Sequence, residues 1–457
     1  MSKIDYFNTK SFKEYSSYNY LLLGLGVGNK GIEKFFINNN IKYSVYDDMS
    51  DKSILNKKTY LEEVENELIF YDVIVKSSGI AYEHKLVQSA MEYGIEVVTD
   101  LDLYARFFPE SFNITVTGSN GKTTTVNLIH SVLNDFKLVG NIGNPIFNNL
   151  SFTKNNKFII EASSFMLEFC EYFNSKFNVL LNIVPTHLEH HHDFNSYIRS
   201  KMNLLKNTKK DDYIIYNYDD IVLRNLVKVN NGIKIPISIK NLTLMNKGIG
   251  VYIKGDYIYY YNNKFMKLSK IKVLGEHNIY NIMACIAVCV NYYKLNKKKL
   301  FKNRIIKKIC SFKGLEHRLE YIGKYGKTRF YNDSKSTNFN ALKVALEAMK
   351  DKKVLLICGG KSRKDNYELI KSKIKNVRKV YCYGENRNEF YKFFIGEKKE
   401  VYCFETLNEI INNLNIVNMD IVLFSPGSIS YDQYIDYERR GTDFKRLIRG
   451  KYLNKRV

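Results

Sequence analysis

The stretch that decides the fold is NITVTGSNGKTT, at residues 113–124. Apolar and β-branched residues at 113–116 predict a strand, and the apolar run after residue 124 predicts a helix. A glycine-rich loop between a strand and a helix N-terminus favours phosphate, because backbone N–H groups and the helix dipole attract negative charge. We expect ATP or GTP here, with Lys122 neutralising the phosphates and Thr123 reaching Mg2+. The other loop residues in this prediction are Gly118, Ser119, Asn120, Gly121 and Thr124.

The N-terminal segment alternates strand and helix. An apolar strand is predicted at 20–25, followed by glycines, a helical pattern and a second strand at 43–46 that ends in Asp47. This order is typical of a nucleotide-binding βαβ unit. The spacing Gly26-x-Gly28-x-x-Gly31 fits a dinucleotide fingerprint, but an ordinary tight turn explains the glycines equally well. Further strands are predicted at 73–75 and from residue 96.

The remaining chain continues the same alternation. Central strands are predicted at 158–160 and 179–183, with a long helix from 278 to about 293, and C-terminal strands at 329–332, 354–358, 380–383 and 421–424. We therefore predict an α/β fold with three domains. They are a Rossmann-like domain at 1–106, a central P-loop ATPase-like domain at 107–307 and a Rossmann-like domain at 308–457.

Composition limits the classes of protein. The 457 residues suffice for about three domains of roughly 150 residues. Seven cysteines without a C-x-x-C pair indicate reduced thiols. No apolar run reaches the roughly 18–20 residues of a membrane span, and no signal peptide is recognisable at the N-terminus. We expect a cytoplasmic protein that does not insert into membranes.

The formal net charge of +23 suggests a nucleic-acid partner at first sight. However, the basic residues are spread along the chain, and no known nucleic-acid-binding motif is present. The abundance of Lys, Asn, Ile and Tyr is what AT-rich codons produce. We expect no nucleic-acid partner, because a basic surface also suits polyanionic small substrates.

Three further places carry candidate chemistry. Glu161 follows the predicted strand at 158–160 and is a candidate Mg2+ ligand, or alternatively a cap of the next helix. Four histidines, at 187 and 190–192, resemble a zinc site, but adjacent residues point in different directions. We expect one functional histidine with three solvated neighbours. From the residues alone, Lys201 is an ordinary surface lysine.

Six further motifs follow the same order along the chain as the phosphate loop: NIGNP at 141–145, EASSF at 161–165, GEHNIYN at 275–281, GLEHRLE at 314–320, NDSKSTN at 332–338 and SPGSISYDQY at 425–434. Together with the loop, these motifs resemble the Mur ligase family, and most closely its D-glutamate-adding members. The resemblance covers almost the whole chain in the right order. It implies that ATP phosphorylates the carboxylate of UDP-N-acetylmuramoyl-L-alanine, and that the amino group of D-glutamate then displaces phosphate. This would be a cytoplasmic step of peptidoglycan precursor synthesis.

The resemblance also implies site residues. Catalytic roles fall to Lys122, Glu161, His187, Lys201 and Lys335. Two Mg2+ ions would be held by Thr123, Glu161, His187 and Lys201, the last as a CO2-derived carbamate. Further ATP contacts would be Asn278, Asn281, Arg318 and Asp333. The UDP-substrate would meet Val27, Gly28, Asp47, Ser77, Gly79 and Asn141, and D-glutamate would meet Thr337, Arg363, Ser430 and Tyr437.

Some residues depart from the family pattern. Thr186, Glu189 and His190 replace the usual flanks of the motif histidine, Met166 replaces a frequent glutamine, Ser78 a frequent proline and Arg363 a lysine. Two alternatives stay open. One is a sister enzyme, either another amino-acid-adding Mur ligase or a folylpolyglutamate-type ligase. The other is a non-catalytic, basic nucleic-acid-binding protein on a degenerate ligase fold. We expect a monomer.

Overall fold

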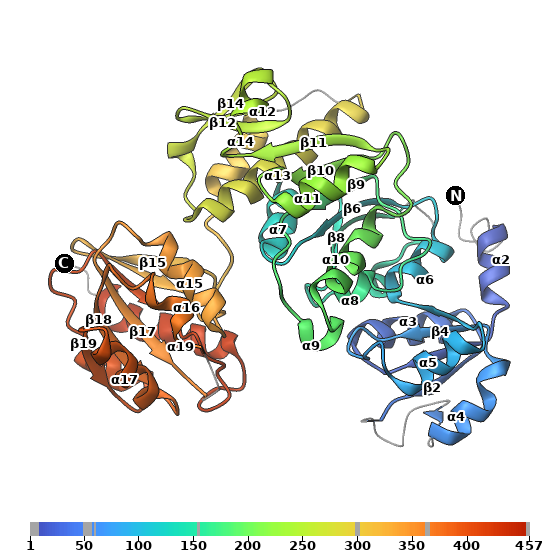
Figure 1. Cartoon of the computed structure of the whole chain (residues 1–457), viewed down its shortest axis with the longest axis horizontal. Coiled ribbons are helices and arrows are strands. Elements are labelled where there is room, and N and C mark those ends of the chain that lie inside the picture. Colours follow the sequence, from blue (N-terminus) through green and yellow to red (C-terminus); the bar gives the residue numbers. More distant parts are fainter. Residues whose placement is uncertain are drawn as a thin grey trace. The chain divides into compact units, whose positions relative to one another are not determined.

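The structure is a computed structural model, and it describes residues 9–48, 57–58, 61–152, 156–297, 302–361 and 366–453. The chain divides into two compact units. The first comprises Met1–Leu268 and Tyr280–Ile309, and the second Ser269–Ile279 and Cys310–Val457. The α/β fold class is confirmed by three parallel-rich sheets, two of them in the first unit (Figure 1).

The N-terminal sheet has five parallel strands in the order β3-β2-β1-β4-β5. The predicted strand at 20–25 is two residues too long, because the backbone leaves the strand at Gly24, whose φ is +79°. The strands are β1 Tyr20–Leu23, β2 Tyr43–Tyr46, β3 Lys57–Lys58, β4 Val73–Lys76 and β5 Glu96–Val98. The helices are α2 Lys10–Ser16, α3 Val27–Asn38, α4 Leu61–Glu67, α5 Lys85–Glu92 and α6 Asp100–Phe107.

The central sheet has nine strands in the order β14-β13-β12-β11-β10-β9-β6-β8-β7. Neighbouring strands from β7 to β12 in this order pair in parallel, whereas β12 with β13 and β13 with β14 pair antiparallel. They are β6 Phe112–Thr117, β7 Lys137–Gly140, β8 Lys157–Glu161, β9 Phe177–Leu180, β10 Tyr213–Asn217, β11 Ile233–Ser238, β12 Val251–Lys254, β13 Tyr257–Tyr260 and β14 Asn263–Lys267. The helices are α7 Lys122–Val132, α8 Ser164–Leu167, α9 Leu188–His191, α10 Phe194–Met202, α11 Ile221–Leu226, α12 Leu242–Lys247, α13 Glu276–Leu295 and α14 Lys302–Ser311.

The two sheets of the first unit share one hydrophobic core. Phe35 and Phe107 of the N-terminal segment belong to the same buried cluster as Phe147 and Phe158 of the central segment. The ring centroids of Phe35 and Phe147 are 5.2 Å apart. Such aromatic contacts bury large apolar areas, which stabilises the two sheets as one body. The domain boundary expected at 106 falls in the last turn of α6, and it stays a prediction.

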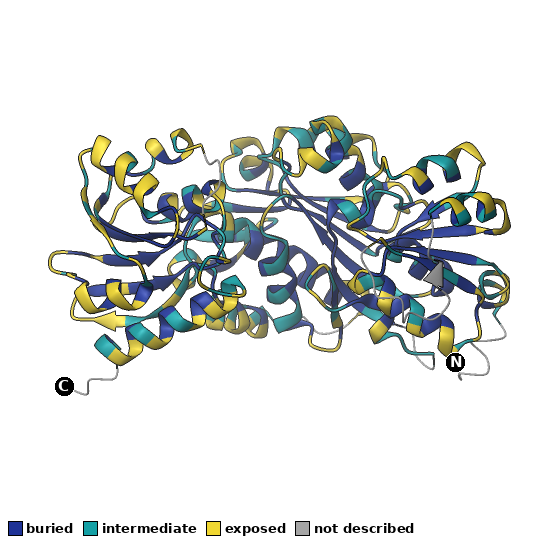
Figure 2. Ribbon diagram, turned by 90° about the horizontal axis from the view of Figure 1, so that it is seen from below, coloured by how far each residue is buried: buried dark blue, intermediate teal, exposed yellow. Residues whose placement is uncertain are grey.

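The second unit contains a six-stranded sheet in the order β15-β16-β20-β17-β18-β19. Only β15 is antiparallel to its neighbour, and buried hydrophobic clusters cover both faces (Figure 2). The strands are β15 Glu320–Tyr325, β16 Thr328–Asn332, β17 Val354–Gly359, β18 Val377–Tyr383, β19 Glu400–Cys403 and β20 Ile421–Phe424. The helices are α15 Phe339–Ala348, α16 Glu368–Lys371, α17 Arg387–Gly396, α18 Leu407–Asn413 and α19 Tyr437–Ile448.

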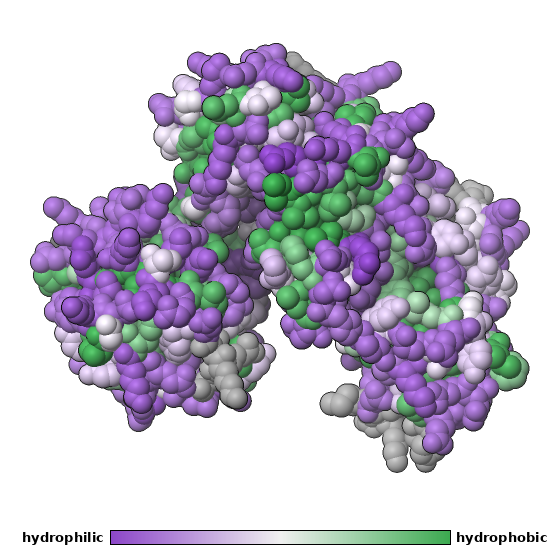
Figure 3. All heavy atoms as spheres, in the orientation of Figure 1, coloured by the Kyte–Doolittle hydropathy of each residue, from purple (hydrophilic) through white to green (hydrophobic). Residues whose placement is uncertain are grey.

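Across the described residues, no helix is both long enough and apolar enough to span a membrane. Hydrophilic residues make up most of the face drawn in Figure 3. Apolar residues gather on that face over the region where Figure 1 places α11, whose first residue, Ile221, is exposed. An exposed apolar area of this kind is ordinary on a folded protein.

Candidate active site

The phosphate loop joins the centre of the nine-stranded sheet to α7. It begins after Thr117 and ends at Gly121, which caps the helix with a φ of +89°. A Cβ on Gly121 would lie 2.5 Å from Oδ1 of Asn281, so a larger residue does not fit. The Lys122 ammonium donates to the carbonyl oxygens of Gly118 (2.7 Å) and Ser119 (3.1 Å). The predicted strand, loop and helix are therefore confirmed as local structure.

Two residues that the sequence did not single out hold this loop in place. Asn182 accepts hydrogen bonds from the backbone N–H groups of Ser119 and Asn120, both at 2.8 Å. The Tyr197 hydroxyl lies 2.8 Å from the Ser119 hydroxyl. Asn182 follows β9, which ends at Leu180 rather than at the predicted residue 183. The chain leaves the sheet early because these residues bond to the neighbouring loop.

Glu161 lies at the carboxyl end of β8, opposite Val116 of β6. Its side chain is buried, and Oε1 accepts a hydrogen bond of 3.0 Å from Asn141. Oε2 is buried, and none of the described residues offers it a hydrogen bond, which is a costly state for a carboxylate oxygen. The capping alternative is wrong, because Ser163 and not Glu161 caps α8. A bare, buried carboxylate oxygen fits a Mg2+ ligand.

His187 caps the N-terminus of the short helix α9 with a left-handed φ of +56°. Its side chain is half exposed, and its ring lies edge-on to Phe165 at 5.0 Å. Partial burial, together with the positive charges of Lys122 and Lys201, lowers the pKa of the imidazole below its usual value. The ring is therefore neutral at neutral pH, which is the form that binds a metal.

Lys201 lies on α10 and is almost completely buried, so the interpretation as a surface lysine is wrong. Its Nζ donates to the Gly118 carbonyl (3.1 Å) and lies 3.4 Å from the Thr117 hydroxyl. In the described part of the chain, no carboxylate forms an ion pair with it. Burial, and then the charge of Lys122, lower the pKa of this amine well below its usual range. A neutral, nucleophilic amine is therefore favoured here.

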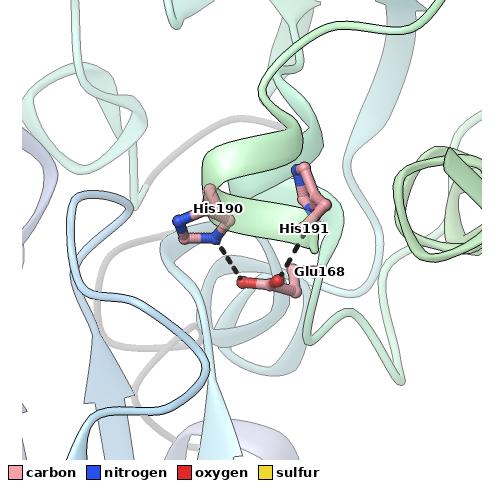
Figure 4. Close-up of side chains that lie close together, drawn as sticks. All are labelled: Glu168, His190 and His191. Carbon is pink, nitrogen blue, oxygen red and sulfur yellow. Dashed lines mark hydrogen bonds and ion pairs between the residues drawn. The ribbon is translucent and has the colours of Figure 1, made fainter. Parts of the chain in front are cut away.

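The expectation of three solvated histidines is wrong for two of them. His191 is buried, with Nε2 2.9 Å from the Ser164 hydroxyl and Nδ1 3.5 Å from Oε1 of Glu168. Nε2 of His190 lies 3.2 Å from Oε2 of the same glutamate (Figure 4). Both rings reach one carboxylate because α9 packs over it. Only His192 is largely exposed, and it contacts Glu83.

The N-terminal sheet brings its predicted residues together at the carboxyl ends of β1, β2 and β4. Asp47 accepts a hydrogen bond of 2.5 Å from the N–H of Leu25. A Cβ on Gly26 would lie 2.4 Å from Oγ of Ser77, so the glycine permits a close approach of two turns. The remaining residues of this group are Val27, which is exposed, Gly28 and Gly79. Asn141 lies apart from them, beside Glu161.

The comparisons with known proteins identify the family. The family model of the Mur ligase middle domain matches residues 116–289. The UDP-N-acetylmuramoylalanine–D-glutamate ligase of Oenococcus oeni is 30% identical over 450 residues, which are 96% of this chain and 98% of that protein. A protein of the same name from Natranaerobius thermophilus is 32% identical and covers 94% and 97%, respectively. The chain belongs to the Mur ligase family.

Solved structures share the fold of this Mur ligase. The UDP-N-acetylmuramate–alanine ligase of Thermotoga maritima has a TM-score of 0.57 at 15% identity, with 95% of this chain and 99% of that chain covered. A MurF ligase of Acinetobacter baumannii has a TM-score of 0.58 at 13% identity, covering 96% and 93%. The MurF ligase of T. maritima, solved in complex with ADP, has a TM-score of 0.55 at 15% identity, covering 96% and 97%. At these identities the likeness supports the three-domain fold alone.

The second unit of this Mur ligase brings two of its predicted residues, Lys335 and Tyr437, into direct contact. The Lys335 ammonium donates to the Tyr437 hydroxyl at 3.0 Å and lies above its ring. Ser430 is buried in the loop after β20, and Thr337 is half-buried. Arg318 lies in the segment before β15, and Asn278 lies in the first turn of α13. Arg363 lies outside the described residues.

A buried arginine that the sequence did not single out joins two of these segments. The Arg440 guanidinium donates to the Ser334 carbonyl (2.7 Å) and to the Ser428 carbonyl (2.9 Å). Ser334 belongs to the segment of Lys335, and Ser428 to the loop of Ser430. Arg440 lies four and eight residues before the buried Phe444 and Ile448, a helical spacing that places it on the inward face of α19.

The buried carboxyl group of Asp333 should make the stability of the second unit of this Mur ligase depend on pH. It is 8% exposed and accepts hydrogen bonds from the Ser425 hydroxyl and the Leu319 N–H. Burial raises the pKa of its carboxyl from 3.8 to about 7. Between about pH 4 and pH 7 the folded chain keeps a proton that the unfolded chain has released, so stability falls as the pH rises through this range and is level above it.

The substitution Asp333→Asn tests this. Wild-type stability relative to the variant should be higher at pH 5 than at pH 8, by about 2–3 kcal/mol, and should rise further below pH 5. Thermal unfolding of both proteins across this range measures the difference. Asp351→Asn, at an exposed carboxylate, is the control and should show no such trend. A wild-type advantage that does not change with pH would contradict the prediction.

Proposed function

We propose that this Mur ligase joins D-glutamate to UDP-N-acetylmuramoyl-L-alanine at the expense of ATP. The observation that carries the proposal is the similarity, over nearly the whole length, to proteins named for that reaction. The activated carboxylate would be an acyl phosphate, and the amine of D-glutamate would displace its phosphate to leave an amide. This reaction is a step of peptidoglycan precursor synthesis. We propose that it takes place in the cytoplasm and that the enzyme is a monomer.

The phosphate loop supplies the ATP site in this proposal. Lys122 lies across the loop, where its ammonium neutralises the charge that gathers on the transferred phosphoryl group. The glycines leave room for the backbone to approach the phosphates, with Ser119, Asn120, Thr123 and Thr124 around them. Asn281 lies next to the loop at Gly121, which supports its role as a further contact.

The side chains around the loop fit two Mg2+ ions. Thr123, Glu161, His187 and Lys201 would hold them, the last as a carbamate. The bare Oε2 of Glu161 and the neutral ring of His187 support this assignment. When bound, Mg2+ stabilises negative charge on phosphoryl oxygens. Asn141 holds the other oxygen of Glu161, and so fixes which way the carboxylate points.

Lys201 becomes a carbamate by a balanced reaction. Its neutral amine attacks the carbon of CO2, so that the N–C bond forms while the electron pair of one C=O π bond moves onto oxygen, and the nitrogen then loses one proton to solvent. The lowered pKa supports this, because only the neutral amine has the required lone pair. The carbamate replaces a buried neutral amine with an anionic oxygen ligand.

The second unit would hold the amino-acid substrate and part of the nucleotide. Thr337, Arg363, Ser430 and Tyr437 are proposed for D-glutamate, whereas Asn278, Arg318 and Asp333 are proposed for ATP. Lys335 is proposed to assist the reaction. The Lys335–Tyr437 hydrogen bond supports a shared role, because it presents a cation beside a hydroxyl where a carboxylate is to be bound. The N-terminal residues Val27, Gly28, Asp47, Ser77 and Gly79 are proposed for the UDP group.

Amino-acid selectivity tests the proposed function. Purified protein with ATP, Mg2+ and UDP-N-acetylmuramoyl-L-alanine should release phosphate with D-glutamate, and more than 100-fold more slowly with L-glutamate, L-alanine or diaminopimelate. The reason is that a site built to bond polar groups discriminates strongly against analogues that leave them unpaired. Turnover with another amino acid instead would indicate a sister ligase. No turnover, with salt-sensitive binding to nucleic acid, would favour a non-catalytic nucleic-acid-binding protein.

A further inference from the structure

Glu168 lies where segments from both sheets of the first unit meet. It follows the last residue of α8, and its side chain is mostly buried. Oε2 lies 3.2 Å from the ammonium of Lys76 and 3.2 Å from Nε2 of His190, while Oε1 lies 3.5 Å from Nδ1 of His191. Figure 4 shows both imidazole rings directed at this carboxylate. One anion therefore holds three basic groups.

Lys76 connects this carboxylate to the N-terminal sheet. It is the last residue of β4 and is completely buried. Its ammonium also donates to the carbonyl of Ile80 at 2.6 Å, and so closes the turn at 77–79. That turn contains Ser77 and Gly79, which are proposed for the UDP group. A shift of the Lys76 ammonium would therefore change the shape of the turn.

His190 and His191 connect the same carboxylate to His187. The backbone N–H groups of both residues donate to the carbonyl of His187, at 3.1 and 3.0 Å. A helix this short has little stability of its own, so its side-chain contacts decide where it lies. The ring of Phe165 contacts the rings of all three histidines at 4.5–5.4 Å.

His191 extends the network to the other proposed metal ligands. Its Nε2 lies 2.9 Å from the hydroxyl of Ser164, three residues after Glu161. Its Nδ1 lies 3.4 Å from the hydroxyl of Ser200, the neighbour of Lys201. The segments of Glu161, His187 and Lys201 are thus all bonded to a pair of histidines that Glu168 holds.

A metal ion is the competing explanation of this cluster. Glu168, His190 and His191 offer ligand atoms within 4.8 Å of one another. However, the Lys76 ammonium lies 3.2 Å from the same carboxylate oxygen, and it would repel a divalent cation there. Both nitrogens of the His191 ring also lie beside hydroxyl groups, those of Ser164 and Ser200. The geometry therefore favours a network that positions other residues.

We infer that Glu168 is a positioning residue that couples the turn at 77–79 to the segment of His187, so that binding of the UDP-substrate and activation by Mg2+ depend on one carboxylate. This inference rests on the proposed function. A partly buried anion with three basic partners is rigid, because breaking one contact leaves another charge unpaired. Both ends of the network would loosen together when the charge is removed.

The test is Glu168→Gln in the full chain, which keeps the size of the side chain and removes its charge. We expect the Kd for UDP-N-acetylmuramoyl-L-alanine, measured by calorimetry without ATP, to rise at least 10-fold. The Mg2+ concentration for half-maximal activity should also rise at least 10-fold, whereas the KM for D-glutamate should change less than 2-fold. Glu171→Gln is the matched control, since Glu171 also contacts a lysine, Lys206, but at an exposed position. It should change none of these quantities.

Lys76→Gln and the double variant complete the design. If the residues act together, the double variant should weaken UDP-substrate binding no more than the stronger single variant. If Glu168→Gln does not fold, Lys76→Gln alone must show the linked increases in Kd and in Mg2+ requirement. If Glu168→Gln and Lys76→Gln lower kcat but leave the Kd for the UDP-substrate and the Mg2+ requirement unchanged, the inference is overturned. Stoichiometric Zn2+ binding by wild type that Glu168→Gln abolishes would also overturn it, in favour of a metal site. A wild-type protein that does not bind the UDP-substrate would instead count against the proposed function.

Discussion

Glu161→Gln should lower kcat by about 100- to 1000-fold, the effect expected when one preorganised charged group is removed from a reaction centre. Among the described residues, the buried Oε2 has no hydrogen-bond partner, so burying its charge costs free energy that no hydrogen bond to this oxygen offsets. The variant should therefore melt at the wild-type temperature or above it. Steady-state kinetics over a range of Mg2+ concentrations, together with thermal unfolding, measure both effects.

The exposed Glu110 provides the control for this substitution. Glu110→Gln should keep both the activity and the Mg2+ dependence of the wild type. A Glu161→Gln variant that is fully active at ordinary Mg2+ would remove Glu161 from the metal site. A variant that is inactive because it is unfolded would show instead that the carboxylate has a structural role.

Lys201→Gln should lower kcat to a similar extent, by about 100-fold or more. The glutamine is neutral, so it does not bury a charge, but it cannot form a carbamate. Wild-type activity should fall when CO2 is removed and return with bicarbonate, whereas the variant should ignore both treatments. With 13C-labelled CO2, a carbamate signal should appear in the wild type and be absent from Lys201→Gln.

Lys206→Gln, at an exposed lysine just beyond α10, is the matched control and should behave as wild type. A wild type without a carbamate signal that is insensitive to CO2 removal would contradict the carbamate. If Lys201→Gln were nonetheless inactive in that case, the neutral amine itself would be the functional group. The two treatments thus separate the lysine from its modification.

Most of the fold follows from local pattern. The strands at 43–46 and 421–424 match the prediction, because short apolar runs bounded by polar residues leave little freedom of assignment. The strand at 179–183 was misplaced, since its pattern continues while the backbone turns toward Ser119. A contact with a distant loop of this kind has no counterpart in hydrophobic periodicity.

The candidate site divides in the same way. The phosphate loop and Glu161 stand out because each lies directly after a predicted strand. The burial of Lys201 depends on its contacts with the phosphate loop, and the pairing of His190 and His191 depends on Glu168; both sets of partners are distant in sequence. Single-residue reasoning assigned all three to solvent for that reason. The resemblance identified Lys201, but it contained no information on what surrounds it.

The aromatic core common to the first two sheets bears on how such a chain can be cut and recombined. A fragment that ends at Arg106 would expose Phe35 and the rings around it, so it should aggregate instead of folding. The first two predicted domains should therefore fold and be exchanged between proteins only together, although each has a sheet of its own. In a chimaera with another ligase, a junction between these two sheets would pack core side chains from two different proteins against each other. A junction near residue 310 would keep all the side chains of this aromatic core from one protein.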